Sequence, residues 1–232
     1  MENNKAENSE VSVTAGTKSD SLKQQNTVAL TDPSADFREL DPLTACYSRE
    51  TFFRMTSEML MKHPDTSYVM VSCNINRFKV VNELLGTAAG DRILVAFGQD
   101  LQQYITDGTY GRLEADHFAV CVPASSFNPE EFVAHLDRLF DRMKLGHKII
   151  CYFGIYPIDD ISLPVAIMSD RATIALGSVK GNYRQRYAYY DDKMKETLLR
   201  EQKIVSEADT ALRSGQFRIH LQPVFSVRQK NF

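Results

Sequence analysis

Hydrophobic residues in the central part of the chain alternate between two spacings. Where they recur every three or four positions they predict amphipathic helices, and short β-branched runs predict strands. Ser48 is a suitable cap for the first helix, and Gly86 ends the short second one. The predicted helices span residues 48–61, 78–85, 88–105, 129–144 and 163–179, and the predicted strands span 68–75, 109–113, 117–122, 148–156 and 187–190. This order indicates an α/β (α+β) fold with a central, mainly antiparallel sheet and helices on its faces.

Both ends of the chain depart from this alternation. Residues 1–36 are rich in Ser, Thr, Asn, Glu and Lys without a periodic apolar pattern, which is typical of a disordered leader or linker. After the folded domain at residues 37–191, helical spacing continues to Ser214, and a further strand is predicted over residues 217–225. We therefore assign residues 192–215 to a connecting helix and residues 216–232 to the start of a second domain.

Composition and charge exclude several classes of protein. The 232 residues carry 27 Lys and Arg against 30 Asp and Glu, and this balance argues against a nucleic-acid partner. No stretch approaches the roughly 20 apolar residues of a membrane span, and no signal peptide is visible. The four cysteines are widely spaced without a CxxC pair. Three of them, Cys73, Cys121 and Cys151, lie in apolar strand-like runs, so we expect these three to pack as small hydrophobic residues, and the compartment to be reducing and cytoplasmic.

Candidate chemistry gathers at three polar segments. The first is the end of the strand at Asn74, the second is the helix pair that carries Asn82 and Asp91, and the third is the hairpin tip at residues 114–117. If the strand lies beside the hairpin, Asn74 and Asp116 face one another. Paired carboxylates there would bind Mg²⁺ for phosphoryl transfer. This chain offers one carboxylate and neutral amides. The residues alone therefore do not favour a metal site over an ordinary polar strand end and turn.

Three segments resemble the GGDEF domain, the diguanylate cyclase family. Residues 41–52 are similar to its opening motif, residues 74–91 follow its DIDxFKxxND…GD segment without a gap, and residues 112–118 occupy the place of its signature. The resemblance covers about residues 37–191. It implies a palm-like fold similar to that of nucleotidyl cyclases, with GTP as ligand and Mg²⁺ as cofactor.

The signature departs from the family pattern at several positions. Asn74 replaces the first metal-binding Asp, while the backbone of Ile75 keeps its place beside the metal. A neutral amide is a weaker Mg²⁺ ligand than a carboxylate, so the resemblance implies a weakened metal site. The signature itself reads Glu114, Ala115, Asp116, His117 and Phe118, in which the metal carboxylate Asp116 and the final Phe are kept. Two glycines that let the backbone approach phosphate are lost, so we assign no catalytic residue.

At the other positions of the family pattern, some of the family's residues are lost and others are kept. The family's phosphate-holding Lys and Arg fall on Gly177 and Gly181, with Lys180 as a partial substitute, and its inhibitory RxxD motif is absent at residues 105–108. The resemblance implies a nucleotide site that is kept at Phe78, Lys79, Asn82 and Asp91. A carboxylate accepts from guanine N1–H and N2–H₂, an edge that adenine does not present, and an Asn amide donates and accepts on base edges.

The end of the chain resembles the opening of an EAL domain, the cyclic-di-GMP phosphodiesterase barrel. The residues that carry this resemblance are 217–224, FRIHLQPV. It implies an EAL domain as partner in the same full-length protein, with its catalytic carboxylates beyond Phe232. By that route this chain cannot hydrolyse cyclic-di-GMP.

Three functions remain open from the sequence. The first is an inactive regulatory module that binds GTP beside an EAL phosphodiesterase. The second is a weakly active diguanylate cyclase that joins two GTP into cyclic-di-GMP. The third is a dimerisation scaffold that binds no nucleotide and forms a homodimer through the apolar face of the long helix.

Overall fold

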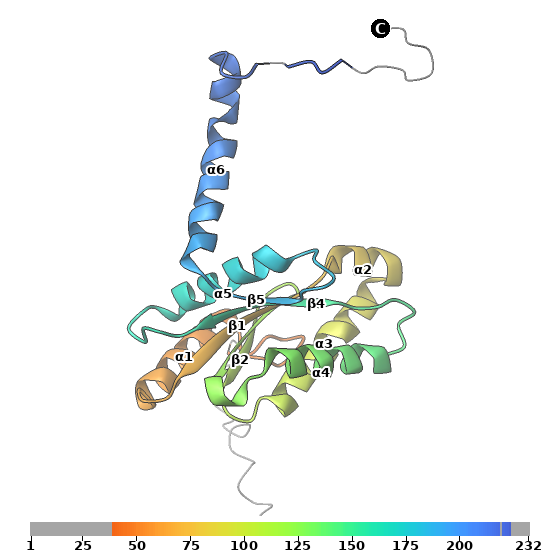
Figure 1. Ribbon diagram of the computed structural model, residues 1–232. Coiled ribbons are helices and arrows are strands. Elements are labelled where there is room, and N and C mark those ends of the chain that lie inside the picture. Colours follow the sequence, from red (N-terminus) through yellow and green to blue (C-terminus); the bar gives the residue numbers. More distant parts are fainter. Residues whose placement is uncertain (1–38, 219, 224–232) are drawn as a thin grey trace, which may run out of the picture. The chain divides into compact units, whose positions relative to one another are not determined.

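The computed structural model describes residues 39–218 and 220–223 of the chain (Figure 1). Its centre is a five-stranded sheet in the order β2-β3-β1-β4-β5. Neighbouring strands are antiparallel except for the parallel pair β4 and β5. The strands are β1 (Tyr68–Ile75), β2 (Thr109–Glu114), β3 (His117–Pro123), β4 (Cys151–Pro157) and β5 (Tyr187–Tyr189). The expected mainly antiparallel sheet is therefore confirmed.

Helices cover both faces of this sheet (Figure 1). The helices of the described chain are α1 (Arg49–Lys62), α2 (Phe78–Leu85), α3 (Thr87–Tyr104), α4 (Pro129–Arg142), α5 (Val165–Val179) and α6 (Asp192–Arg213), with a short 3₁₀ turn at Ala124–Ser126. Of these, α6 projects away from the sheet (Figure 1). The Ser48 hydroxyl accepts from the Thr51 N–H at the start of α1, as the sequence predicted. The order of elements agrees with the prediction, because each is marked by its own local pattern.

Strand alternation divides the apolar side chains between two main cores. On one face, buried residues of α3 and α4 such as Phe97 and Leu136 pack on Val71 and Phe118. On the other face, buried residues of α1 and α5 pack on Met70. All four cysteines are buried as free thiols, so the prediction for Cys73, Cys121 and Cys151 is confirmed, and Cys46 is buried as well.

Helix α5 approaches the sheet very closely at Gly154 of β4. A Cβ atom on residue 154 would lie 1.8 Å from the carbonyl oxygen of Ala172 and 2.3 Å from the amide nitrogen of Leu176. Only a residue without a side chain fits between strand and helix here. This glycine therefore allows the short distance between α5 and the sheet, and with it the position of the residues at the end of α5.

Two expectations about strand boundaries were wrong. The strand β4 begins at Cys151 and not at Lys148, although the Asn76 N–H still donates to the Ile150 carbonyl just before it. The strand predicted over residues 217–225 is not formed at the described residues 217, 218 and 220–223. Phe217 and Leu221 there are exposed, because an isolated strand has no neighbour to pair with. The predicted leader 1–36 lies outside the described residues.

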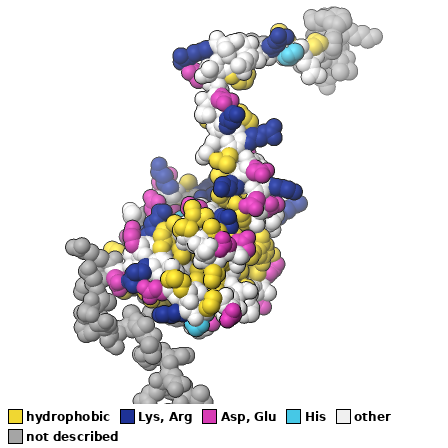
Figure 2. All heavy atoms as spheres, turned by 90° about the vertical axis from the view of Figure 1, so that its left-hand side faces the viewer, with side chains coloured by type: hydrophobic (Ala, Val, Ile, Leu, Met, Phe, Trp, Pro, Cys, Tyr) yellow, Lys and Arg dark blue, Asp and Glu magenta, His cyan; other side chains and the backbone are white. Residues whose placement is uncertain are grey.

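Helix α6 has no buried residue. Figure 2 shows hydrophobic side chains distributed along it among acidic and basic ones. Near its start, Met194 packs against the small cluster around Tyr152 and Leu176. Of the described helices, none combines the length and apolar character needed to cross a membrane.

Candidate functional site

A row of three polar side chains crosses the sheet at one end of its central strands. Asn74 of β1 pairs with His117 of β3 on one side and with Tyr152 of β4 on the other. Residues opposite one another on neighbouring strands point to the same face, so all three lie on the side covered by α5. The Tyr152 hydroxyl is buried without a hydrogen-bond partner among the described residues.

Asn74 and Asp116 are in direct contact, as the sequence predicted for a strand beside the hairpin. The Asn74 side-chain amide donates to Asp116 Oδ2 at 2.8 Å, and the backbone N–H of Ile75 donates to the same oxygen at 3.1 Å. Asp116 Oδ2 is thus saturated by N–H donors. The Asn74 amide presents its NH₂ group, and not its oxygen, to the carboxylate.

This donor set does not fit a paired-carboxylate magnesium site. Mg²⁺ demands near-octahedral oxygen ligation and is usually held through one or two carboxylates. In this site one carboxylate is present, and one of its oxygens is committed to Asn74 and Ile75. Within the described residues, no three His, Cys, Asp or Glu side chains converge as a metal site would require.

The hairpin turn is strained at Ala115. This residue adopts φ of 45°, a left-handed conformation that glycine takes without penalty and alanine does not. Glu114 beside it is exposed. Arg112 clamps the turn, donating from Nε to the Ala115 carbonyl at 2.7 Å and from Nη1 to both carboxylate oxygens of Asp41. The clamp thus contacts the carbonyl of the strained residue directly.

Asp41 is the second half of this clamp. Burial raises the pKa of its carboxyl, but hydrogen bonds from Thr44 and the Arg112 guanidinium outweigh burial and hold that pKa below its ordinary value. Asp41 is therefore ionised at neutral pH and ties the opening motif to the signature turn.

His117 lies under α5 in a hydroxyl network. Its Nε2 and the Ser72 hydroxyl are hydrogen-bonded at 2.6 Å, and Ser72 continues to Thr173 of α5 at 3.2 Å. Burial lowers the pKa of His117, and the positive charges of Lys180 and Arg49 lower it further. The imidazole is thus neutral at physiological pH and joins the signature to α5.

Burial also governs Asp116. It raises the pKa of the carboxyl above the ordinary value, opposed in part by backbone hydrogen bonds and by the charges of Lys180 and Arg112. Lys180, immediately after α5, therefore acts electrostatically on both Asp116 and His117. The positions of Gly177 and Gly181, where the family pattern has cations, face open space, since a Cβ atom on either residue would have no atom within 4 Å.

A second part of the site lies between α2 and α3. Asn82 of α2 packs against Gly90 of α3 so tightly that a Cβ on residue 90 would lie 1.8 Å from Asn82 Oδ1 and 3.1 Å from the Phe78 ring. Asn82 Oδ1 is buried and has no hydrogen-bond partner among the described residues. A buried acceptor without a donor costs about 1–3 kcal/mol, so this atom is suited to a ligand that donates a hydrogen bond.

The other predicted nucleotide contacts differ in exposure. Asp91, next to Gly90 in the first turns of α3, is exposed, and so is Lys79. Phe78 is half-buried and packs against the core of the α3 and α4 face. The structure therefore brings Phe78, Asn82 and the backbone beside Asp91 together.

Sequence reasoning missed four residues that shape this site. Ser72, Tyr152 and Thr173 have no local pattern that distinguishes them from core positions. Arg112 stands inside the recognised signature segment at residues 112–118, and that position was the signal that could have identified it; its pairing with Asp41 is seen only in the structure.

Comparison with known proteins gives a consistent family. The family model "Diguanylate cyclase, GGDEF domain" matches residues 38–186. The signaling protein YkoW of Bacillus subtilis is 25% identical over 205 residues, which are 82% of this chain and 25% of that protein. The probable diguanylate cyclase DgcF of Escherichia coli K12 is 34% identical over 106 residues, 45% of this chain and 32% of that protein. The chain thus spans about a quarter to a third of the length of these relatives.

Solved structures show the same fold. The GGDEF domain of YfiN from Pseudomonas aeruginosa matches with a TM-score of 0.57 at 22% identity, covering 69% of this chain and 99% of that one. The GGDEF domain of DgcB from Caulobacter crescentus, solved in complex with c-di-GMP, matches with a TM-score of 0.54 at 17% identity, covering 65% and 95%. The palm-like architecture expected from the sequence is therefore confirmed.

Proposed function

Because the chain belongs to the GGDEF domain family, we propose that it is a regulatory module of cyclic-di-GMP signalling that binds a guanine nucleotide without cyclising it. It carries the fold and part of the site of a diguanylate cyclase. The observation that carries the proposal is the hydrogen bond between Asn74 and Asp116.

That hydrogen bond bears directly on catalysis. Joining two GTP molecules requires a ribose hydroxyl to attack an α-phosphate while pyrophosphate leaves, and metal charge and positioning do most of the work in phosphoryl transfer. The amide of Asn74 occupies Asp116 Oδ2 without adding a negative charge. Loss of metal charge and of the glycine turn together corresponds to roughly a 10³-fold or larger loss of rate.

Guanine recognition is supported by a different part of the site. The buried Asn82 Oδ1, which has no hydrogen-bond partner in the described part of the chain, offers one acceptor. The exposed carboxylate of Asp91, the residue after Gly90, offers a second. Both suit the N–H donors on the Watson–Crick edge of guanine. Lys79 and Lys180 supply positive charge for phosphate on the exposed surface.

An adjoining EAL domain is the partner we propose. The support is the resemblance of residues 217–224 to the start of that domain, together with the exposure of Phe217 and Leu221. Apolar residues left exposed at the start of a barrel are those that its remaining strands would cover.

The test is calorimetric titration of GTP with Mg²⁺ into the chain, after which the contents of the calorimeter cell are assayed for cyclic-di-GMP. We expect binding heat without product, and loss of that heat in Asp91→Ala. Asp141→Asn removes an exposed carboxylate on α4, away from the site, and serves as the matched control. Cyclic-di-GMP in the calorimeter cell would support the weakly active diguanylate cyclase. Restoring the family residues with Asn74→Asp, Glu114→Gly and Ala115→Gly would then raise its rate.

Absence of both heat and product would favour the dimerisation scaffold. The observation behind that alternative is the set of exposed apolar residues on α6. These residues are Leu198, Leu199, Ile204, Val205 and Leu212. Sedimentation equilibrium of the wild-type chain and of Val205→Glu distinguishes the scaffold from the nucleotide-binding regulatory module. Only the scaffold requires a dimer that this variant disrupts.

A further inference from the structure

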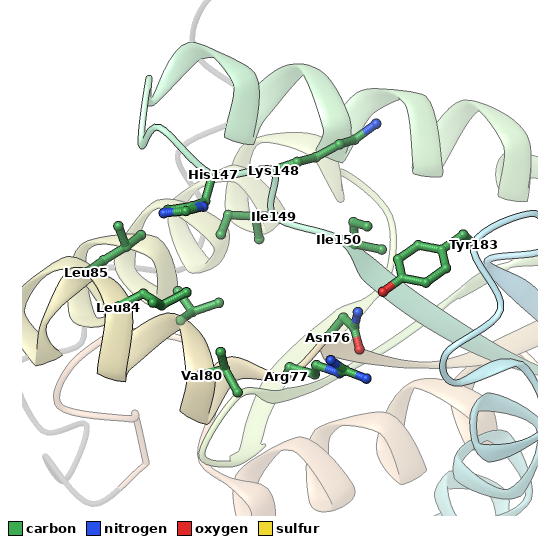
Figure 3. Close-up of a pocket in the computed structure, with 11 residues that line it drawn as sticks. Asn76, Arg77, Val80, Leu84, Leu85, His147, Lys148, Ile149, Ile150 and Tyr183 are labelled. Carbon is green, nitrogen blue, oxygen red and sulfur yellow. The ribbon is translucent and has the colours of Figure 1, made fainter.

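A groove lies along one side of α2 (Figure 3). Its volume is about 250 Å³. One wall is α2, the facing wall is the segment before β4, and Tyr183 closes one end (Figure 3). Its apolar lining consists of Val80, Val81, Leu84, Leu85, Ile149 and Ile150. Neither Phe78 nor Asn82 lines it, so it is separate from the proposed nucleotide site.

Several of the lining side chains are far more exposed than is usual for apolar residues. Leu84 is 63% exposed, Tyr183 is 66% exposed and Val80 is 42% exposed. Val80 and Leu84 are one helical turn apart, so they form a continuous apolar edge along α2. Exposed apolar residues gathered around a concave surface are typical of a protein interaction site.

The polar part of the groove is entirely cationic or neutral. Arg77, His147 and Lys148 line it together with Asn76, and no Asp or Glu does. Among the described residues, neither Arg77 nor Lys148 forms a salt bridge. Their charge is left for a binding partner, and the matching partner is acidic.

We propose that this groove docks an acidic amphipathic helix of a partner protein. Small-molecule sites usually enclose 300–1,000 Å³ and bury most of the ligand. This groove is smaller and has exposed walls, which suits a row of leucine-like side chains spaced at i and i+4 on a helix laid along α2. Acidic residues flanking that row would face Arg77 and Lys148.

A second copy of the chain is a poorer occupant. A two-fold contact through the same groove would bring the basic residues of both copies together without an acidic residue from the lining. The charge of the groove therefore favours a different, acidic protein.

Docking would act on a helix at the surface of the domain. Helix α2 has no buried residue, and it lies between two residues with positive φ, Arg77 at 51° and Gly86 at 82°. The same helix carries Asn82. A change in GTP affinity on docking is a further consequence, and this step alone rests on the proposed function.

The probe is a fluorescent peptide of roughly 15 residues, built from Leu at helical i, i+4 and i+7 spacing and Glu elsewhere. Titrated against the full chain, it is expected to shift the NMR methyl signals of Val80, Leu84, Ile149 and Ile150. Leu84→Glu and Lys148→Glu are expected to weaken binding at least tenfold. Met61→Glu, which alters an apolar residue that is 66% exposed on α1, is the matched control and keeps wild-type affinity.

The proposal is overturned by any of three results. These are methyl shifts outside the groove, equal affinity for the same peptide with Lys in place of Glu, and a groove-dependent dimer that Leu84→Glu abolishes in sedimentation equilibrium. GTP titration with and without the peptide follows as a separate measurement. If GTP does not bind at all while the groove signals shift, the proposed function fails and the docking surface stands.

Discussion

The side-chain amide of Asn74 donates a 2.8 Å hydrogen bond to Oδ2 of Asp116. A direct amide–carboxylate contact therefore stands where a metal-dependent phosphoryl-transfer site needs two negative ligands around a cation. The backbone N–H of Ile75 donates a second hydrogen bond to the same oxygen. The pair of residues 74 and 116 thus contributes at most one negative charge.

Asn74→Asp should make folding dependent on magnesium. The substitution removes the hydrogen bond and places two carboxylates against each other, which we expect to cost about 1–3 kcal/mol in the free energy of unfolding without metal. Mg²⁺ should restore that stability by bridging the pair. Thermal denaturation of both proteins with and without Mg²⁺ measures this, with the wild-type chain as the magnesium-insensitive control. A variant equally stable in both conditions would show that residue 116 is not in contact with residue 74.

Asp116→Asn should stabilise the chain increasingly as the pH rises. The variant keeps an acceptor oxygen for Asn74 and Ile75 but removes a buried charge. Since burial raises the folded-state pKa of Asp116, the wild-type chain loses stability as pH rises from the unfolded value near 3.8 through the folded pKa. Urea denaturation at pH 4 and pH 7 should therefore give a larger advantage for the variant at pH 7. An advantage that shrinks toward pH 7 would contradict the raised pKa.

His117→Gln should reduce the sensitivity of the fold to mild acid. The folded-state pKa of His117 is lowered below 6.5, so the unfolded chain binds the proton first and the stability of the wild-type chain falls as pH drops below 6.5. Gln keeps a hydrogen-bonding group for Ser72 but does not titrate. The free energy of unfolding should thus fall less in the variant between pH 7 and pH 5.5. A fall in the variant as large as that of the wild-type chain would contradict the lowered pKa of His117.

Ala115→Gly should stabilise the turn. At φ of 45° an L-residue carries strain of about 1–2 kcal/mol, while glycine costs about 0.5–1 kcal/mol more conformational entropy than alanine on folding. The net gain expected in the free energy of unfolding is therefore between zero and about 1.5 kcal/mol. Chemical denaturation measures it. A loss of stability would mean that the turn does not hold residue 115 in the left-handed conformation.

Gly154→Ala and Gly177→Ala should have opposite effects. The first would place a Cβ 1.8 Å from the Ala172 carbonyl oxygen and force α5 away from β4, at a cost of about 3 kcal/mol or more. The second adds a methyl group in open space within α5, where alanine favours the helix by about 1 kcal/mol. Equal effects of the two substitutions would show that α5 does not lie against Gly154. Denaturation midpoints of the two variants give the comparison.

Local patterns in the sequence were sufficient for most of the secondary structure. The Ser48 cap, the apolar run of β1 and the Gly86 stop each act within a few residues, so they are readable without knowledge of the fold. The strand predicted over residues 217–225 failed for the complementary reason. A strand is stabilised by a neighbouring strand, and residues 217, 218 and 220–223 have none.

The contacts that decide the chemistry of the site are long-range. Asn74 and Asp116 could be expected to meet once β1 was placed beside the hairpin. The pairing of Arg112 with Asp41, 71 residues away, and of His117 with Ser72 could not, since both require the actual register of the sheet and the packing of α5. The residue types and their order thus specify the elements and the family motifs. Whether those motifs form a metal site, a hydrogen-bonded pair or a docking groove depends on distances that arise only when separate elements pack together.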